Sequence, residues 1–201
     1  PLTLESMTRR AALLKRFGAM SEENARIAQE DLFGIENSLK AIKGYQSGLL
    51  DSAVMARKVA DETRMRQAIA TDAQKLAEYG DPYAEIAKAM DAQRQIYLPL
   101  TYIDRMGGFR SDLSGIARAL VRASGERAKP NGDRLREYRD TALASLEQSL
   151  FSTAPIYKSL EIAMMADALA EMKEKMPGSA VVSRVLGDRS PADLAQALIS
   201  G

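Results

Sequence analysis

The sequence contains no histidine and no cysteine. Without these residues it cannot hold a Ser-His-Asp triad, a Cys-His nucleophile, an ordinary zinc site or a Glu-x-x-His di-iron motif. The usual catalytic parts of a hydrolase are therefore missing from these 201 residues, and we expect no metal and no cofactor. The lack of cysteine suits both a reducing cytosol and a periplasm, so it does not indicate a compartment.

Long apolar runs are missing as well. No stretch of about 18 apolar residues occurs, so we predict no membrane span. The first residues of the given sequence do not form a basic-then-apolar leader. Because the chain opens on proline and stops at Ser200-Gly201 without a polar tail, we expect it to be a piece of a longer polypeptide.

Charge of one sign does not dominate, because the formal net charge is +1. No overall field is present to attract nucleic acid or an anionic membrane. Basic residues do gather between positions 118 and 139, but acidic residues are interspersed and no aromatic ladder accompanies them. Mixed charges on helices are typical of a solvated face, so we predict no nucleic-acid partner.

A helical pattern runs along nearly the whole chain. Apolar residues recur at three- and four-residue steps, and no stretch alternates with period two for long enough to indicate a strand. We predict an all-α fold, a bundle of about eight helices forming a single domain over residues 1–201 or two closely packed helical halves. The expected helices cover residues 4–17, 21–50, 52–72, 82–107 with a bend or break at Pro99, 111–129, 133–150, 155–176 and 191–198.

The helix predicted over residues 21–50 has two different faces. An apolar seam that we expect to be core contains Ala28, Leu32, Ile35, Leu39, Ile42, Tyr45 and Leu49. About half a turn away lies what we term the small-residue seam: Gly34, Asn37, Ser38, Ala41, Gly44 and Gly48. Each glycine in a helix interior costs up to about 1 kcal/mol relative to alanine, so something must offset that cost.

Two explanations of the small-residue seam stay open at this point. In the first, a neighbouring backbone approaches closely and Asn37 is hydrogen-bonded across the contact, because a buried unpaired amide costs about 1–3 kcal/mol. In the second, the seam faces a cleft and leaves room for a ligand whose polar end meets Asn37. Spacing alone does not decide between packing and ligand binding.

Five stretches, in order along the chain, carry a resemblance to one family. They are ENSLKAIKGYQSGLLDSAVMARKVADE (36–62), YGDPYAEIAKA (79–89), KPNGDRLREY (129–138), LFSTAPIYKSLE (150–161) and VLGDRSPADLAQALISG (185–201). Together they resemble the bacterial serine exopeptidases typified by dipeptidyl peptidases 7 and 11, serine-peptidase family 46. The similarity lies in the collinear set, because no single stretch is diagnostic.

The resemblance implies a chymotrypsin-like double β-barrel that carries the triad, with a large helical domain inserted between its parts and covering the active-site cleft. This chain would be most of that helical cap, and the catalytic barrel domain of the same polypeptide would be its partner. The resemblance further implies release of dipeptides from free peptide N-termini, a homodimeric full-length enzyme, and a periplasmic or cell-envelope location in a Gram-negative bacterium. The cap alone would not hydrolyse peptides.

The resemblance also implies a role for one residue. In the family an asparagine on a helix of the insertion helps to hold the substrate's α-ammonium, and the matching position is Asn37, followed by Ser38 and Lys40. Gly34, Ser38 and Ala41 would line the cleft beside it. The alternative, from a different class, is a stand-alone helical interaction or regulatory module without catalytic activity.

Overall fold

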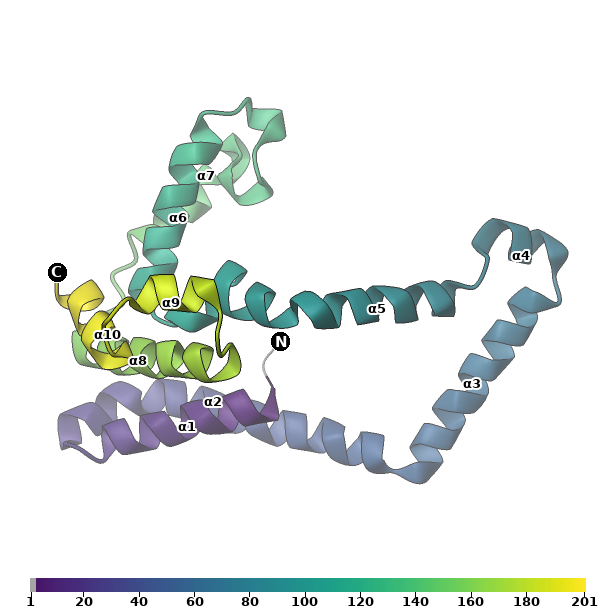
Figure 1. Cartoon of the computed structure of the whole chain (residues 1–201), viewed down its shortest axis with the longest axis horizontal. Helices are drawn as coiled ribbons and strands as arrows, with labels where there is room; N and C mark the ends of the chain where they lie inside the picture. The colour runs from purple at the N-terminus through teal and green to yellow at the C-terminus, as the bar shows by residue number, and fades with distance from the viewer. Residues whose placement is uncertain (1–2) are drawn as a thin grey trace. The chain divides into compact units, whose positions relative to one another are not determined.

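The structure is a computed structural model that describes residues 3–201, and every regular element in that range is helical. The predicted all-α fold is therefore confirmed. The chain divides into two compact units, Pro1–Leu100 and Thr101–Gly201. The helices α1 to α5 belong to the first unit and α6 to α10 to the second; all are labelled in Figure 1. The expectation that both units belong to a single domain stays a prediction.

The first unit contains α1 (Leu4–Gly18), α2 (Glu22–Leu50), α3 (Ser52–Ala70), α4 (Ala73–Tyr79) and α5 (Pro82–Pro99). A π-helical turn, η1 (Leu100–Asp104), and a 3-10 turn, η2 (Gly107–Phe109), follow. The second unit then continues with α6 (Asp112–Arg127), the 3-10 turns η3 (Asn131–Asp133) and η4 (Arg136–Tyr138), α7 (Asp140–Leu150), α8 (Lys158–Lys175), α9 (Ala180–Leu186) and α10 (Pro191–Ser200).

Two short helices were not predicted from the sequence. The pattern expected to run to residue 72 ends at Ala70, and α4 begins after Asp72, whose side chain accepts hydrogen bonds from the backbone N–H groups of Gln74 and Lys75 at 3.0 and 3.1 Å. Such a side-chain cap competes with continuation of the preceding helix. The second short helix, α9, follows the cap Ser179.

The α1–α2 pair forms the packed part of the first unit (Figure 1). Its buried residues are Met7, Ala11, Leu14 and Phe17 of α1 and Ala28 and Ile35 of α2. Because α1 has 15 residues and α2 has 29, α1 covers only the first half of α2. The expectation that the apolar seam is core throughout was wrong at its end, since Tyr45 and Leu49 are 73% and 58% exposed.

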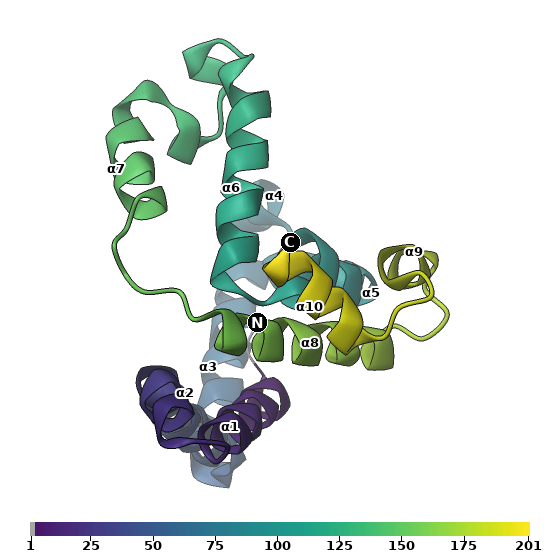
Figure 2. The ribbon, with the colours of Figure 1, turned by 90° about the vertical axis from the view of Figure 1, so that its left-hand side faces the viewer.

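The second unit is built around α8. Its core consists of Tyr102, Met165, Leu169, Met172, Val182, Leu186, Leu194, Ala195 and Ile199, contributed by η1, α8, α9 and α10. Figure 2 shows α10 lying against α8, in agreement with the contacts between these two helices. Met164, Met165 and Met172 of α8 are buried and therefore act as packing residues.

Two buried carboxylates of α8 contact the start of α6 and the residue Arg110 just before it. Glu161 accepts hydrogen bonds from the backbone N–H groups of Asp112 and Leu113, at 3.2 and 2.9 Å, where α6 begins. Glu171 pairs with Arg110 at 3.1 Å. A buried charge is costly unless it is paired or hydrogen-bonded, and a helix N-terminus favours an anion. These contacts therefore fix the start of α6 against α8.

Replacement of Gly107 by alanine tests the tight turn at η2. A Cβ atom there would lie 2.6 Å from the backbone carbonyl oxygen of Thr101. We expect Gly107→Ala to lower the free energy of unfolding by about 1–3 kcal/mol, because the backbone must move. Gly115→Ala is the control: a Cβ there meets no atom within 4 Å. Urea denaturation should show the control to be as stable as wild type or more so, and equal destabilisation of both variants would contradict the prediction.

Candidate functional site

The first half of α2 contacts α1 through ion pairs as well as through apolar packing. Lys15 Nζ lies 2.7 Å from Glu36 Oε1, and Arg10 Nη2 lies 3.7 Å from Asp31 Oδ2. Asp31 and Glu36 flank the buried Ile35 along the helix. These contacts determine which face of α2 turns toward α1, and hence which face turns away from it.

The face that turns away from α1 carries the predicted site residues. Asn37 lies about 160° around the helix axis from Ile35, because successive residues are rotated by about 100°. Gly34, Asn37, Ser38 and Ala41 are all exposed. The structure therefore brings the four predicted residues together on one open face of α2.

The glycines of the small-residue seam are not explained by packing within the first unit, to which α2 belongs. A methyl group added at Gly34, Gly44 or Gly48 would meet no atom within 4 Å. The close backbone approach considered as the first explanation is thus absent from the first unit. These three glycines therefore lower the helix propensity of α2 without permitting a close packing contact within the first unit.

The two polar residues of the site differ in their hydrogen bonds. The hydroxyl of Ser38 donates to the carbonyl oxygen of Gly34 at 2.9 Å, so its proton is used within the helix. Asn37 has no side-chain hydrogen bond to any described residue of the first unit. Its amide therefore offers one carbonyl acceptor and two N–H donors to a group outside the helix.

A charged carboxylate stands next to Asn37 in the sequence. The hydrogen bond and the positive charge of Lys15 hold the pKa of Glu36 below its ordinary value, and the charge of Lys40 adds to this effect. Glu36 therefore stays ionised at neutral pH. Because it is engaged by Lys15, it serves to orient α2 and does not belong to the open face.

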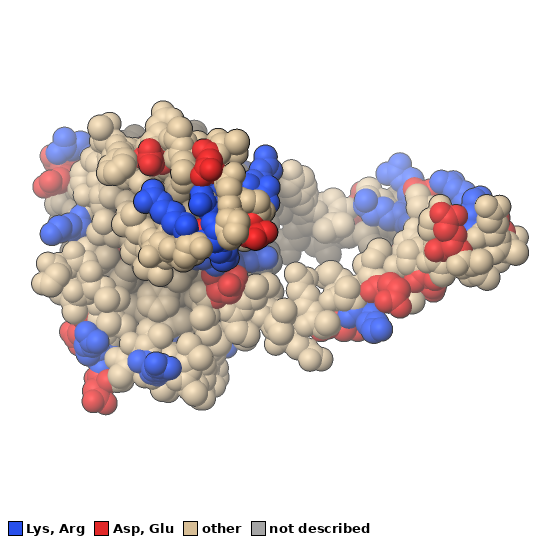
Figure 3. All heavy atoms as spheres, turned by 90° about the horizontal axis from the view of Figure 1, so that it is seen from above, with Lys and Arg blue, Asp and Glu red and all other residues tan. Residues whose placement is uncertain are grey.

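On the face seen in Figure 3, acidic and basic side chains are intermixed. Within the basic stretch of the sequence, Lys129 pairs with Glu126 at 2.7 Å and Arg134 with Asp140 at 2.8 Å. No three acidic side chains within residues 3–201 come together as possible metal ligands. None of the described helices has the length and apolarity that a bilayer-spanning segment needs.

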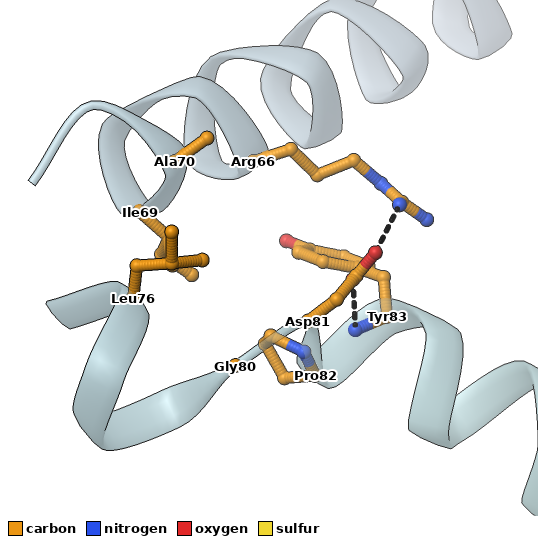
Figure 4. A pocket seen from close by; sticks show the side chains of 8 residues that line it. All are labelled: Arg66, Ile69, Ala70, Leu76, Gly80, Asp81, Pro82 and Tyr83. Carbon is orange, nitrogen blue, oxygen red and sulfur yellow. Dashed lines mark hydrogen bonds and ion pairs between the residues drawn. The ribbon is translucent and has the colours of Figure 1, made fainter. Parts of the chain in front are cut away.

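A second candidate site is a hollow of about 150 Å³ where α3, α4 and α5 meet (Figure 4). Arg66 closes it, with its guanidinium 4.5 Å from the centre of the Tyr83 ring, 3.5 Å from Asp81 and 2.9 Å from Glu62. Asp81 also accepts the backbone N–H of Tyr83 at 3.1 Å, as the cap of α5. Since the cation and the carboxylates are engaged with one another, this cluster holds the corner between the helices.

One residue of the open face was not singled out from the sequence. Phe33 is 73% exposed and precedes Asn37 by four residues. The sequence does contain a signal for its exposure, because Phe33 falls outside the three- and four-residue steps of the apolar seam. Only the apolar seam of an amphipathic helix faces the core, so a large apolar residue outside the seam is expected to be exposed.

Replacement of Gly34 by alanine tests whether the open face is free of packing contacts. We expect Gly34→Ala to raise the free energy of unfolding by up to about 1 kcal/mol, because the added methyl group meets no neighbour and alanine favours the helix. Ala41→Gly on the same face should lower stability by a similar amount. Urea denaturation measures both, and destabilisation by Gly34→Ala would reveal a close contact at this position.

Replacement of Lys15 by methionine tests the fastening of α2 to α1. Methionine keeps the apolar stem but removes the charge, so the pKa of Glu36 should rise toward its ordinary value of 4.5. Because the wild-type pKa is lowered, the stabilisation by the pair is complete above the ordinary pKa and disappears as pH falls through the lowered one. Carbon-detected NMR titration of Glu36 measures the shift. Identical pKa values in both proteins would contradict the role of Lys15.

Comparison with known proteins places the whole chain in one family. The family model described as Peptidase S46 matches residues 1–201. No curated protein and no solved structure matches the chain. The family match extends over all five stretches that carry the resemblance, including the one that contains Asn37, so the resemblance inferred from the sequence is confirmed. This chain belongs to the peptidase S46 family.

Proposed function

We propose that these residues form the helical cap of a serine dipeptidyl peptidase, which covers the active-site cleft and helps to bind the N-terminus of the peptide substrate. Membership of a peptidase family supports a peptide as the substrate. Because the chain has no histidine, a Ser-His-Asp triad must come from residues outside it. The proposed source is a catalytic barrel domain of the same polypeptide.

One observation carries the proposal at the level of residues. Asn37 is exposed, with an unengaged side-chain amide, on the face of α2 opposite the side held by α1. A peptide's α-ammonium, with an ordinary pKa of about 7.7–8.0, is largely protonated at neutral pH. The carbonyl oxygen of Asn37 can accept a hydrogen bond from it, and a hydrogen bond to a charged group contributes about 1.5–3 kcal/mol.

The small residues around Asn37 support the same role. This face carries no large side chain at Gly34, Ala41 and Gly44, so the end of a peptide can approach the helix backbone and the Asn37 amide closely. The nearest cation along the helix is Lys40, whose charge acts on Glu36. The propensity cost of the glycines would then be offset by ligand binding rather than by packing.

The cap would contribute positioning and leave the bond-breaking chemistry to the barrel. Holding the terminal amine a fixed two residues from the nucleophile brings one scissile carbonyl into attack geometry, which converts binding energy into rate. An internal segment of a long chain has no ammonium to offer and would bind less well. This selection accounts for the release of dipeptides by an exopeptidase.

The location and assembly of the full-length enzyme are part of the proposal. We infer a periplasmic or cell-envelope location in a Gram-negative bacterium and a homodimer, both supported by the resemblance to dipeptidyl peptidases 7 and 11. The absence of cysteine is compatible with an oxidising compartment, where stray thiols are a liability.

Replacement of Asn37 by alanine in the full-length enzyme tests the proposed function. We expect kcat/KM for dipeptidyl substrates with a free N-terminus to fall by about 10- to 150-fold, because the variant cannot form the hydrogen bond to the charged group. The preference for free over N-acetylated peptides should shrink with it. The measurement is the initial rate of release of a fluorogenic leaving group from paired free and acetylated substrates.

The control is Gln46→Ala. This variant removes another exposed amide nine residues further along α2, about 180° around the helix from Asn37. It should behave as wild type toward both substrates. Equal kcat/KM values for Asn37→Ala and wild type on the free substrate would refute the role of Asn37.

A further inference from the structure

Phe33 occupies a position that core packing does not explain. Its side chain is 73% exposed. The other large apolar residues in the part of α2 that lies against α1 are buried or half-buried: Ile27, Leu32, Ile35, Leu39 and Ile42. In this part of the helix Phe33 is thus the one large apolar side chain turned toward solvent, on a helix whose orientation is fixed by its apolar packing against α1.

Phe33 and Asn37 are neighbours on the open face. Residues four apart in a helix lie one above the other, and a helical side chain leans toward the N-terminal end. The ring of Phe33 therefore lies on the N-terminal side of the Asn37 amide. On the other side, Ala41 and Gly44 present almost no side chain. An aromatic ring and a polar amide are thus neighbours on a helix face whose other residues are small.

We propose that Phe33 determines specificity for the first residue of the peptide, by packing its ring against that residue's side chain while Asn37 holds the ammonium. The inference rests on the proposed role of Asn37. The ammonium and the side chain of an N-terminal residue are both attached to its Cα atom, so a side chain whose ammonium is at Asn37 must lie within one helical turn of it. Among the described residues of the open face, Phe33 supplies the only large apolar surface at that distance.

The chemistry of the contact defines which peptides would benefit. An aromatic ring gains from covering aliphatic or aromatic side chains, in proportion to the apolar area removed from water. A first residue that is glycine has no side chain to cover, and an acidic one would lose hydration against the ring. Phe33 therefore favours peptides that begin with an apolar residue such as leucine over those that begin with glycine.

The test uses the full-length enzyme and two fluorogenic dipeptidyl substrates that differ only in the first residue, leucine or glycine. We expect Phe33→Ala to reduce the ratio of kcat/KM values, leucine-first over glycine-first, by about tenfold, because no ring then covers the leucine side chain. The change should appear as a higher KM for the leucine-first substrate with kcat little altered. Phe33→Leu, which restores apolar bulk, should recover most of the ratio.

Phe151→Ala is the matched control, because Phe151 is also an exposed phenylalanine, at 80%, and belongs to the second unit. It should leave the ratio unchanged. The melting temperature of Phe33→Ala should stay near that of wild type, since the side chain is mostly exposed. An unchanged ratio, or an equal loss for both substrates, overturns the role of Phe33.

Failure of this inference and failure of the proposed function give different results. If Asn37→Ala loses its preference for free N-termini while Phe33→Ala keeps the wild-type ratio, only the role of Phe33 is overturned. If Asn37→Ala behaves as wild type, the proposed function fails, and with it the reason for placing the first residue beside Phe33.

Discussion

The packing of α1 against the first half of α2 is the contact on which the candidate site depends. Leu14 of α1 and Ile35 of α2 are buried in it, and the ion pair between Lys15 and Glu36 closes its edge. Because a helix has a fixed rotation per residue, burying Ile35 turns Asn37 in the opposite direction. One apolar interface thereby decides which residues of α2 are available to a ligand, although none of the available residues takes part in it.

The second unit is stabilised by an apolar core together with buried, hydrogen-bonded carboxylates. Its core is apolar and centred on α8, yet three of its buried residues are the glutamates Glu126, Glu161 and Glu171. Each accepts hydrogen bonds from a backbone N–H group or pairs with a basic side chain. A buried carboxylate gains little stability over an apolar residue, but it restricts which arrangement is acceptable, because any other arrangement leaves it unpaired. These residues therefore specify how the connecting segments meet the core.

The remaining helices of the first unit depend mostly on local interactions. None of the residues of α3, α4 and α5 is buried. Asp51, Asp72 and Asp81 cap these helices in turn, and the Arg66 and Tyr83 pair holds the corner between α3 and α5. Most helical stability in proteins comes from packing of an apolar face, which these helices lack, so caps and corner contacts carry more of their stability than they do in the α1–α2 pair.

The sequence by itself determined the helical class, most helix starts and the two faces of α2, because capping and apolar periodicity are local properties of the chain. Ser21, Ser111 and Ser190 cap α2, α6 and α10 in the structure, which are three of the helices that the sequence predicts. Only the tertiary structure decided that α1 ends before it can cover Tyr45, that no backbone of the first unit approaches Gly34, and that Phe33 stands exposed beside Asn37. These features depend on which helices meet and over what length, and periodicity within one helix carries no information about its partner.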